Sequence, residues 1–275
     1  MEKKRRESEE NDENEDMSAW VLYAANEHNT KFDALEYLNG FYSSATNDLA
    51  MQTVLFFLPG LCYCLPESIR TLLDLGAGPT VYIPITLRKR AERIYTSDYA
   101  ECNRKILTKW ANSELSFDWG NICDWIEKIE ASNESAEEMQ SLTRRKLKAV
   151  LQVNVFNESV IESVHFQNDP NEKIPRQFHV VASIFCLEYA SETYEQYQTA
   201  VRHTVGLIET GGYLVQGGVL NENEYSFGDC RFRCHKLTRS QVIGTLKECG
   251  METNKGVNFK LIVSNDIFLL VSRKL

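Results

Sequence analysis

Glycine and proline are scarce in this sequence, with 14 glycines and 6 prolines among 275 residues. This excludes a collagen-like repeat and a low-complexity chain, and a hydrophobic content of 43% is ordinary for a globular protein. The most apolar stretch, residues 54–65, is 12 residues long and contains Pro59-Gly60, so it is too short to span a bilayer. No apolar segment follows Met1, so the sequence predicts neither a secretory leader nor a membrane helix.

Basic residues are outnumbered, with 30 Lys and Arg against 39 Asp and Glu and a formal net charge of −9. Such a field repels DNA and RNA, and the basic runs 88–90 and 144–146 are too short to form a binding track. Residues 1–16 hold four basic and eight acidic side chains, which contribute −4 of the total. Because this segment is almost without apolar residues, we expect a disordered charged tail, followed by one domain over residues 17–275.

The eight cysteines form no Cys-x-x-Cys pair, and no His lies at zinc-finger spacing from them. Cys230, Cys234 and His235 could supply part of a metal site, but a fourth ligand is not evident, so no metal is predicted. Buried, reduced thiols are the simpler interpretation, and they predict a cytosolic protein.

Strand-like and helix-like patterns alternate along most of the chain. Helical patterns begin after Thr193 and Thr238, where Gln196 and Gln241 complete capping-box spacing, and Gly250 follows the second of them. This alternation predicts a mostly parallel sheet with helices on both faces. The predicted strands are 71–75, 94–97, 149–155, 179–185, 213–219, 257–263 and 267–272, and further helical patterns cover 81–90 and 103–111.

The N-terminal region, about residues 17–65, is expected to form a helical cap. Apolar periodicity from Trp20 to Leu38 predicts two short helices, and residues 47–58 predict a third. Residues 127–148 are charged and helix-forming, whereas residues 157–176 are polar and expected to be a loop. No internal repeat or Gly/Ser linker divides the chain, which favours a single domain.

The first predicted strand ends in the glycine turn Asp74-Leu75-Gly76-Ala77-Gly78-Pro79-Thr80. Open α/β sheets bind ligands beyond the carboxyl ends of their strands, but a lone Gly-x-Gly is a weak signal and an ordinary turn is about as common. Val81 replaces the third glycine of a dinucleotide fingerprint, and Pro79 removes an N–H that would bind a pyrophosphate. NAD or FAD is therefore disfavoured as the cofactor.

Asp98 closes the second predicted strand and follows Gly78 by 20 residues. A carboxylate at this position can accept hydrogen bonds from both ribose hydroxyls of an adenosine. A ligand with an adenosine but no phosphates fits this turn and this acid best, and S-adenosylmethionine is such a ligand.

Further motifs accompany the turn. The most specific of them are Phe117-Asp118-Trp119 and the Gly-Pro-Thr-x-Tyr motif that begins at Gly78. The others are Glu36-Tyr37-Leu38, Phe41-Tyr42, Ser97-Asp98-Tyr99 with Asn103 and Trp110, Phe185-Cys186-Leu187-Glu188, and residues 267–275. From about Phe32 to Leu275 the chain resembles the nicotinamide, phenylethanolamine and thioether (indolethylamine) N-methyltransferases. This resemblance implies a class I methyltransferase fold: a Rossmann-like α/β domain with a seven-stranded, mostly parallel sheet, helices on both faces and an N-terminal helical lid.

The resemblance also implies how the S-adenosylmethionine site is built. Tyr37 and Tyr42 would lie over the cofactor, although a helix face packed on the core explains these tyrosines and Tyr82 as well. Asn154-Val155 stands where the family usually has Asp-Val beside the adenine, and an Asn oxygen accepts from the adenine amino group more weakly than a carboxylate does. The remaining positions are Gly76, Thr80 and Tyr82 at the methionine end, Asp98 and Asn103 at the ribose, and Gly78 and Tyr99 nearby.

Methyl transfer to an amine is a one-step displacement that needs alignment of the nucleophile and a free lone pair on nitrogen. Glu188 and Glu222 look like the two amine-contacting acids of the phenylethanolamine enzyme, which would orient the amine and accept its proton. Glu222 reads equally well as a solvated loop residue. The nicotinamide enzyme has an Asp where Gly218 stands, so the sequence favours an arylalkylamine acceptor first and nicotinamide or a pyridine second. Tyr225 and Asp266 are weaker candidates for the pocket wall.

The sequence therefore predicts a monomeric, S-adenosylmethionine-dependent N-methyltransferase of small molecules. The alternative is a degenerate methyltransferase fold that binds a ligand without turnover, for which Asn154 is the single supporting feature. An NAD-dependent oxidoreductase is disfavoured by Pro79 and Val81, and a nucleic-acid methyltransferase by the short basic runs. Neither a nucleic acid nor a membrane is expected as a partner.

Overall fold

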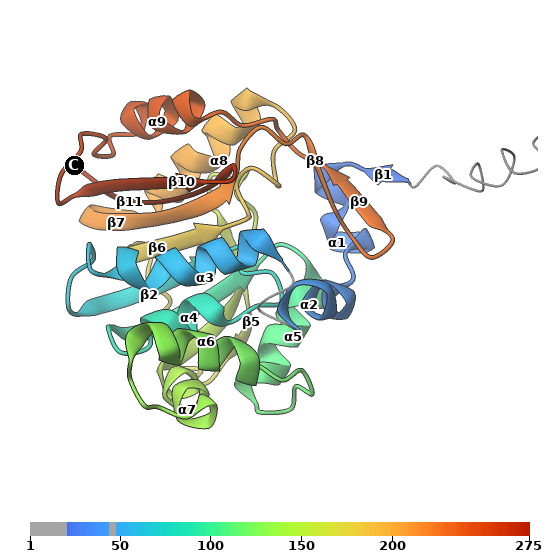
Figure 1. Cartoon of the computed structure of the whole chain (residues 1–275), viewed down its shortest axis with the longest axis vertical. Helices are drawn as coiled ribbons and strands as arrows, with labels where there is room; N and C mark the ends of the chain where they lie inside the picture. The colour runs from blue at the N-terminus through green and yellow to red at the C-terminus, as the bar shows by residue number, and fades with distance from the viewer. Residues whose placement is uncertain (1–20, 44–47) are drawn as a thin grey trace, which may run out of the picture.

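The computed structural model describes residues 21–43 and 48–275, so the predicted tail, residues 1–16, lies outside the described part of the chain. Figure 1 shows a central twisted sheet with helices packed against it and a smaller group of elements at one end. No helix within the described residues is long and apolar enough to cross a membrane.

Eight strands form the main sheet in the order β10-β11-β7-β6-β2-β3-β4-β5. Strands β7, β6, β2, β3 and β4 form the central part of the sheet and are parallel to one another. At the two edges, β11 is antiparallel to both β7 and β10, and β5 is antiparallel to β4. The predicted mostly parallel sheet is confirmed, but it has eight strands rather than seven. The bounds are β2 Ile69–Leu75, β3 Ala91–Asp98, β4 Leu147–Val153, β5 Ile161–Gln167, β6 Phe178–Ile184, β7 Ile208–Val219, β10 Phe259–Ser264 and β11 Ile267–Arg273.

The additional strand is β5, which lies within residues 157–176, where the sequence predicted a loop. Four of its seven residues are exposed, because β5 is an edge strand that pairs with β4 alone. Its sequence therefore carries little of the apolar alternation that identifies a half-buried strand. The loop prediction was wrong because main-chain pairing, rather than side-chain burial, forms this strand.

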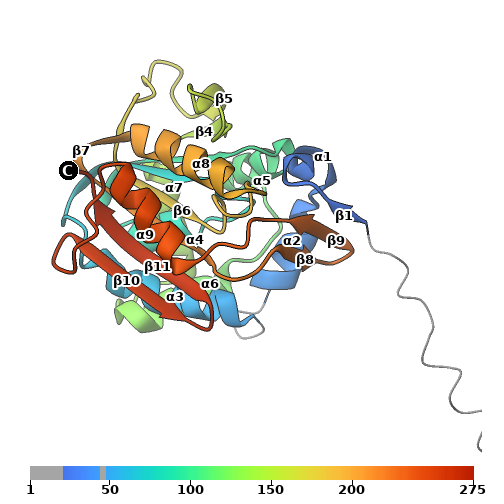
Figure 2. The same cartoon turned by 90° about the horizontal axis from the view of Figure 1, so that it is seen from above.

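Helices cover both faces of the sheet, as Figures 1 and 2 show. Along β2 successive side chains alternate between the two cores: Leu72 packs with the cluster under α3 to α6, and Leu73 with the cluster under α8 and α9. The predicted capping boxes at Thr193 and Thr238 are both present. The helices are α3 Leu49–Cys62, α4 Tyr82–Leu87, α5 Glu101–Ala111, α6 Gly120–Glu130, α7 Ala136–Lys146, α8 Tyr194–Gly206 and α9 Arg239–Glu248.

A small three-stranded sheet and short helices form a cap beside the main sheet. Strand β1 (Leu22–Tyr23) pairs in parallel with β9 (Cys230–Arg233), which pairs with β8 (Glu224–Phe227). The helix predicted to begin near Trp20 is therefore wrong for Leu22 and Tyr23. These residues form a strand because they pair with β9, about 200 residues further along the chain, and local periodicity carries no signal of such a distant partner. The helical part follows as η1 Ala25–Glu27, α1 His28–Lys31 and α2 Ala34–Tyr42.

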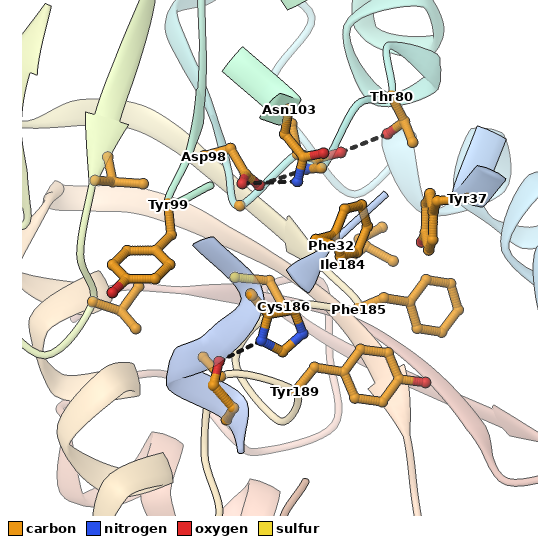
Figure 3. Close-up of a pocket in the computed structure, with 18 of the residues that line it drawn as sticks. Phe32, Tyr37, Thr80, Asp98, Tyr99, Asn103, Ile184, Phe185, Cys186 and Tyr189 are labelled. Atoms are coloured by element: carbon orange, nitrogen blue, oxygen red, sulfur yellow. Dashed lines mark hydrogen bonds between the residues drawn. The ribbon is translucent and has the colours of Figure 1, made fainter. Parts of the chain in front are cut away.

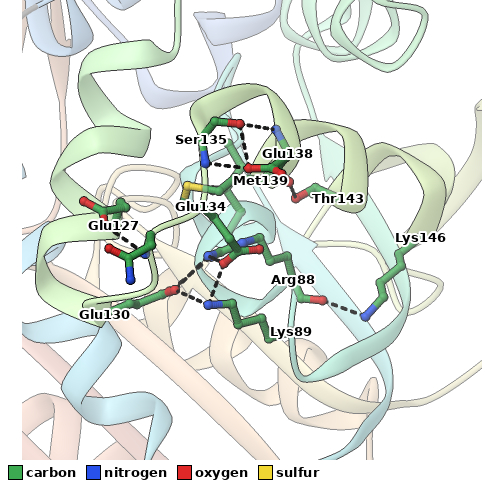
Figure 4. A network of polar contacts seen from close by, with 12 residues as sticks. Arg88, Lys89, Glu127, Glu130, Glu134, Ser135, Glu138, Met139, Thr143 and Lys146 are labelled. Atoms are coloured by element: carbon green, nitrogen blue, oxygen red, sulfur yellow. Dashed lines mark hydrogen bonds and ion pairs between the residues drawn. The ribbon is translucent and has the colours of Figure 1, made fainter.

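A buried arginine ties together the helices α4, α6 and α7 (Figure 4). The Arg88 side chain is completely buried and donates to Glu130 at 3.1 and 2.7 Å and to Glu134 at 2.5 Å. The neighbouring Lys89 also contacts both carboxylates, although its side chain is 45% exposed. The Lys146 ammonium group donates to the Arg88 carbonyl at 2.7 Å. Because the Arg88 side chain has no access to water, its charge is compensated by the carboxylates of Glu130 and Glu134.

We expect Arg88→Met to lower the free energy of unfolding by about 2–4 kcal/mol, because removing one partner of a buried ion pair leaves the other charges uncompensated. Lys89→Met is the matched control, and the loss there should stay below about 1 kcal/mol since the lysine is half-exposed. Urea denaturation of the two variants measures both values. Equal losses would contradict a special role for the buried guanidinium.

Candidate active site

The carboxyl ends of β2, β3, β4 and β6 meet at one edge of the main sheet. Strand order reverses at β2, which pairs with β3 on one side and with β6 on the other, and such a reversal opens a crevice. A pocket lies at this edge and is lined in part by residues of the cap; Figure 3 shows several of its lining side chains. Its lining includes Gly76, Ala77, Gly78 and Thr80 after β2, Asp98, Tyr99 and Asn103 after β3, residues 154–156 after β4, Phe185, Cys186 and Tyr189 after β6, and His28, Phe32, Tyr37, Tyr42 and Tyr225 from the cap.

The glycine turn needs both of its glycines, for two different reasons. Both have left-handed backbones, with φ +68° at Gly76 and φ +60° at Gly78. A Cβ at Gly76 would lie 2.1 Å from the Cys186 Sγ, so the turn also packs directly against the end of β6. A Cβ at Gly78 would meet no atom within 4 Å, so only the backbone conformation demands glycine there.

Asp98 is buried at the end of β3 and organises the turn. Its carboxylate accepts from the Gly78 N–H at 2.8 Å, the Ala100 N–H at 2.8 Å and the Asn103 Nδ2 at 3.0 Å. Burial raises the pKa of Asp98, and these hydrogen bonds oppose the rise. A carboxylate has about four acceptor positions, so roughly one remains on Oδ2 for a ligand. The expected contacts of Asp98 to the ribose hydroxyls stay a prediction.

Asp74 is a buried carboxyl group that the sequence reasoning passed over. It is 1% exposed, and neither of its side-chain oxygens has a hydrogen-bond partner in the described part of the chain. Burial, followed by the neighbouring Asp98, raises its pKa well above the usual value. A lone acid inside the apolar run Thr71–Leu75 was the available signal, because uncompensated buried carboxyls are rare outside functional sites.

The described lining carries little positive charge, and the buried Arg104, which lies outside the lining, donates to the Asp98 and Tyr99 carbonyls and opposes the rise in the pKa of Asp98. Among its described lining residues there is no Lys or Arg, and burial lowers the pKa of His28. Asp98 lies on the wall of the pocket, and Asp74 precedes Gly76, the first glycine of the turn, by two residues. The pocket is therefore suited to a ligand that carries positive rather than negative charge.

Aromatic rings dominate the part of the pocket that faces the cap. Tyr189 stacks on Tyr225 with ring centroids 4.0 Å apart, and Phe185 stacks on Tyr189 at 6.3 Å. Tyr225 also hydrogen-bonds through its hydroxyl to the Nε2 of His28, which joins two distant segments of the chain. Phe32 packs on Tyr37 at 5.1 Å on the same side.

Tyr37, Tyr42 and Tyr82 belong both to the packed core and to the lining of the pocket. Tyr42 and Tyr82 are 1% and 2% exposed and stack on each other at 5.7 Å, as a packed core would. Tyr37 contacts Tyr42 at 5.8 Å, and all three line the pocket. Core packing thus positions these rings at the pocket.

Glu188 lies behind the pocket wall rather than on it. Its side chain is 1% exposed, Oε1 accepts from the Val219 N–H at 3.2 Å, and the buried Oε2 has no partner in the described residues. A Cβ on Gly218 would lie 2.2 Å from Oε1, so glycine at 218 makes room for this carboxyl group. Burial raises the pKa of Glu188 to about 8.

The other predicted acids lie outside the pocket lining. Glu222 is exposed on the loop before β8, and Asp266 accepts from Asn221 Nδ2 at 2.9 Å, which braces that loop against the β10–β11 turn. Neither Glu222 nor Asp266 is among the described residues that line the pocket, and the roles of both stay predictions. Tyr225, by contrast, is on the wall.

The cysteines are all free, including the buried Cys62, Cys123 and Cys234. Within residues 21–43 and 48–275, no group of three or more His, Cys, Asp or Glu side chains is arranged to hold a metal ion. Cys234 instead directs its thiol to the Glu222 carbonyl at 3.7 Å.

Comparison with known sequences places this architecture in a family. A family model described as the NNMT/PNMT/TEMT family matches residues 20–275. A nicotinamide N-methyltransferase from Caenorhabditis elegans is 52% identical over 252 residues, which cover 92% of each chain. A phenylethanolamine N-methyltransferase from Macaca mulatta is 28% identical over 81% of this chain and 78% of its own length.

Solved structures agree on the fold. The magnesium protoporphyrin IX methyltransferase of Synechocystis, solved with bound S-adenosylmethionine, superposes with a TM-score of 0.50 at 10% identity, covering 91% of this chain and 95% of its own. The expected class I methyltransferase fold is confirmed. From the family model and the 52% identical relative together, we conclude that this chain belongs to the NNMT/PNMT/TEMT family.

Proposed function

We propose that the pocket binds S-adenosylmethionine and aligns its methyl group with the ring nitrogen of nicotinamide or a related pyridine, releasing S-adenosylhomocysteine. The general activity follows from the family: the chain is an S-adenosylmethionine-dependent N-methyltransferase of small molecules. The choice of acceptor and the role of each residue are the proposal.

The observation that carries the cofactor assignment is the charge of the pocket. S-adenosylmethionine bears a positive sulfonium, whereas NAD bears a pyrophosphate. The described lining offers Asp98 and no Lys or Arg, and Pro79 cannot donate an N–H at the helix start. The free acceptor position on Asp98 suits a ribose hydroxyl, and the left-handed glycine turn allows close approach to the methionine part.

When bound, S-adenosylmethionine supplies an electrophilic methyl group, and the protein's contribution is mainly positioning. Phe185, Tyr189 and Tyr225 offer flat faces that orient an aromatic acceptor, and the cap residues Phe32 and Tyr37 exclude water from that side. A pyridine nitrogen has a free lone pair at neutral pH, so the site needs no general base for this acceptor.

Two observations favour the pyridine type over the arylalkylamine that the sequence favoured first. Neither of the two acids expected to hold an ammonium is in the described pocket lining, since Glu222 is exposed on its loop and Glu188 is buried behind the wall. The 52% identical relative is named a nicotinamide N-methyltransferase, and the phenylethanolamine enzyme is 28% identical.

An arylalkylamine remains the second candidate because of Glu188. Its buried, unpartnered Oε2 and its pKa of about 8 are properties of a group that could take a proton from an amine. We also infer that the chain works as a monomer in the cytosol, without nucleic-acid or membrane partners. The free cysteines and the acidic net charge support this inference.

The activity test is a screen of S-adenosylhomocysteine release with nicotinamide and phenylethanolamine as acceptors, for the wild-type chain and Glu222→Gln. We expect nicotinamide to give the higher kcat/KM, and Glu222→Gln to change that value by less than about twofold, as for an exposed side chain. If Glu222 does contact amines, its substitution raises KM for phenylethanolamine only. Binding of S-adenosylmethionine without release of S-adenosylhomocysteine from any acceptor would instead favour the degenerate binding protein.

Asp98→Ala should weaken S-adenosylhomocysteine binding about 100-fold, measured by calorimetry. Hydrogen bonds to a charged acceptor contribute about 1.5–3 kcal/mol, and this variant loses the ribose contact together with the acceptor of the Gly78 N–H. Asp229→Ala, which removes an exposed acid from the β8–β9 turn, is the control and should leave Kd unchanged. An Asp98→Ala chain with wild-type affinity would refute the assigned ribose contact.

Glu188 predicts a specific pH dependence of stability. Its folded pKa of about 8 lies above the ordinary value, so the folded state holds a proton that the unfolded state has released between about pH 5 and 8. Stability gained from this group is complete below that window and lost as pH rises through it, by up to about 1.4 kcal/mol per pH unit. Glu188→Gln should remove that part of the slope in urea denaturation, whereas Glu222→Gln should retain it. An unchanged slope in Glu188→Gln would exclude the raised pKa.

A further inference from the structure

His28 begins the short helix α1 and lines the pocket, and both nitrogens of its ring are engaged. Its Nδ1 is hydrogen-bonded to the carbonyl of Ala25, three residues earlier, and its Nε2 to the hydroxyl of Tyr225 on β8. His28 and Tyr225 are 197 positions apart in the chain. This contact therefore fixes the N-terminal segment of the cap to the β8–β9 hairpin.

The partners of His28 determine the direction of both hydrogen bonds. Burial lowers the pKa of His28, so its ring is neutral near pH 7 and carries a single N–H. The Ala25 carbonyl can only accept, so the proton lies on Nδ1 and leaves Nε2 as an acceptor. The Tyr225 hydroxyl consequently donates its one proton to His28 and has none left to donate to a ligand.

Stacked rings hold the same pair in place. The His28 ring lies on Phe232 with centroids 4.2 Å apart and 14° between the planes. Phe232 is completely buried and is the cross-strand partner of Tyr225, whose ring stacks on it at 5.5 Å. Tyr225 also stacks on Tyr189, at 4.0 Å. A rotation of the Tyr225 ring would therefore break its hydrogen bond to His28 and its stacking contacts together.

We propose that His28 is a positioning residue for the methyl acceptor, an inference that rests on the proposed function of the pocket. By accepting from the Tyr225 hydroxyl, His28 holds the Tyr225 ring, and through it Tyr189, in one orientation before the acceptor arrives. Binding of an aromatic acceptor then does not have to order these rings, which lowers the entropic cost of binding. His28 acts through Tyr225 and not as a base, because both of its nitrogens are engaged.

The test is a double-variant cycle on His28 and Tyr225. His28→Phe keeps a ring against Phe232 but removes the acceptor, and Tyr225→Phe removes the donor, so each should raise KM for nicotinamide about tenfold. We expect kcat to change by less than about threefold, because a preformed wall contributes equally to the bound ground state and the transition state. Since both substitutions break the same bond, the double variant should also lie about tenfold above the wild-type KM, whereas independent roles would give about 100-fold.

Two further variants separate the hydrogen bond from the ring. His28→Gln is the rescue variant, since its Oε1 can replace Nε2 as the acceptor, and its KM should lie within about threefold of the wild-type value. His165→Phe is the matched control, because it makes the same substitution at an exposed histidine of β5, outside the described pocket lining, and it should leave KM unchanged. If His28→Phe does not fold, His28→Asn takes its place in the cycle, because its shorter side chain does not reach Tyr225.

Calorimetry with S-adenosylhomocysteine distinguishes the acceptor side of the pocket from the cofactor side, and His28→Phe should leave this Kd within about twofold of the wild-type value. Additive effects in the cycle, no rescue by His28→Gln, or a loss of S-adenosylhomocysteine affinity as large as the rise in KM overturns the positioning role. Phenylethanolamine replaces nicotinamide in the same cycle if the wild-type chain methylates only the amine. A wild-type chain that methylates neither acceptor refutes the proposed function itself, and the inference falls with it.

Discussion

The parallel pairing of β2 between β3 and β6 is the constraint on which the site depends. Because the chain leaves β2 toward one face of the sheet and β6 toward the other, the connections after these strands diverge and leave a crevice between them. The glycine turn, Asp98, residues 154–156 and the aromatic wall after β6 are all strand-end segments at that crevice. These segments lie next to one another because of the strand order, and no local sequence motif brings them together.

Three carboxyl groups are buried at or near the crevice: Asp98 on the wall of the pocket, and Asp74 and Glu188 outside the described lining. Asp74 and Glu188 each retain oxygens without partners, and Asp98 keeps one acceptor position, while the described lining contains no Lys or Arg. Burial raises the pKa of all three, which limits the cost of their desolvation, and a cationic ligand restores the balance.

The cap couples two ends of the chain at the acceptor side. His28 follows β1, and Tyr225 belongs to β8, yet their side chains are hydrogen-bonded and stacked at 5.8 Å. The parallel pairing of β1 with β9 supports this contact. The cap residues in the described pocket lining include the aromatic side chains Phe32, Tyr37 and Tyr225 and no Lys, Arg, Asp or Glu.

The sequence by itself determined the alternation of strands and helices, the capped helices after Thr193 and Thr238, and the glycine turn with Asp98, because those signals are local: periodicity, capping and backbone conformation. Strand β1 escaped prediction because its partner β9 lies about 200 residues away, and β5 because an exposed edge strand carries little apolar alternation. Only the tertiary structure decided how many acceptor positions of Asp98 are already occupied by the Gly78, Ala100 and Asn103 donors. Hydrogen bonds use up donors and acceptors one at a time, and that count can be made only once every neighbour is in place.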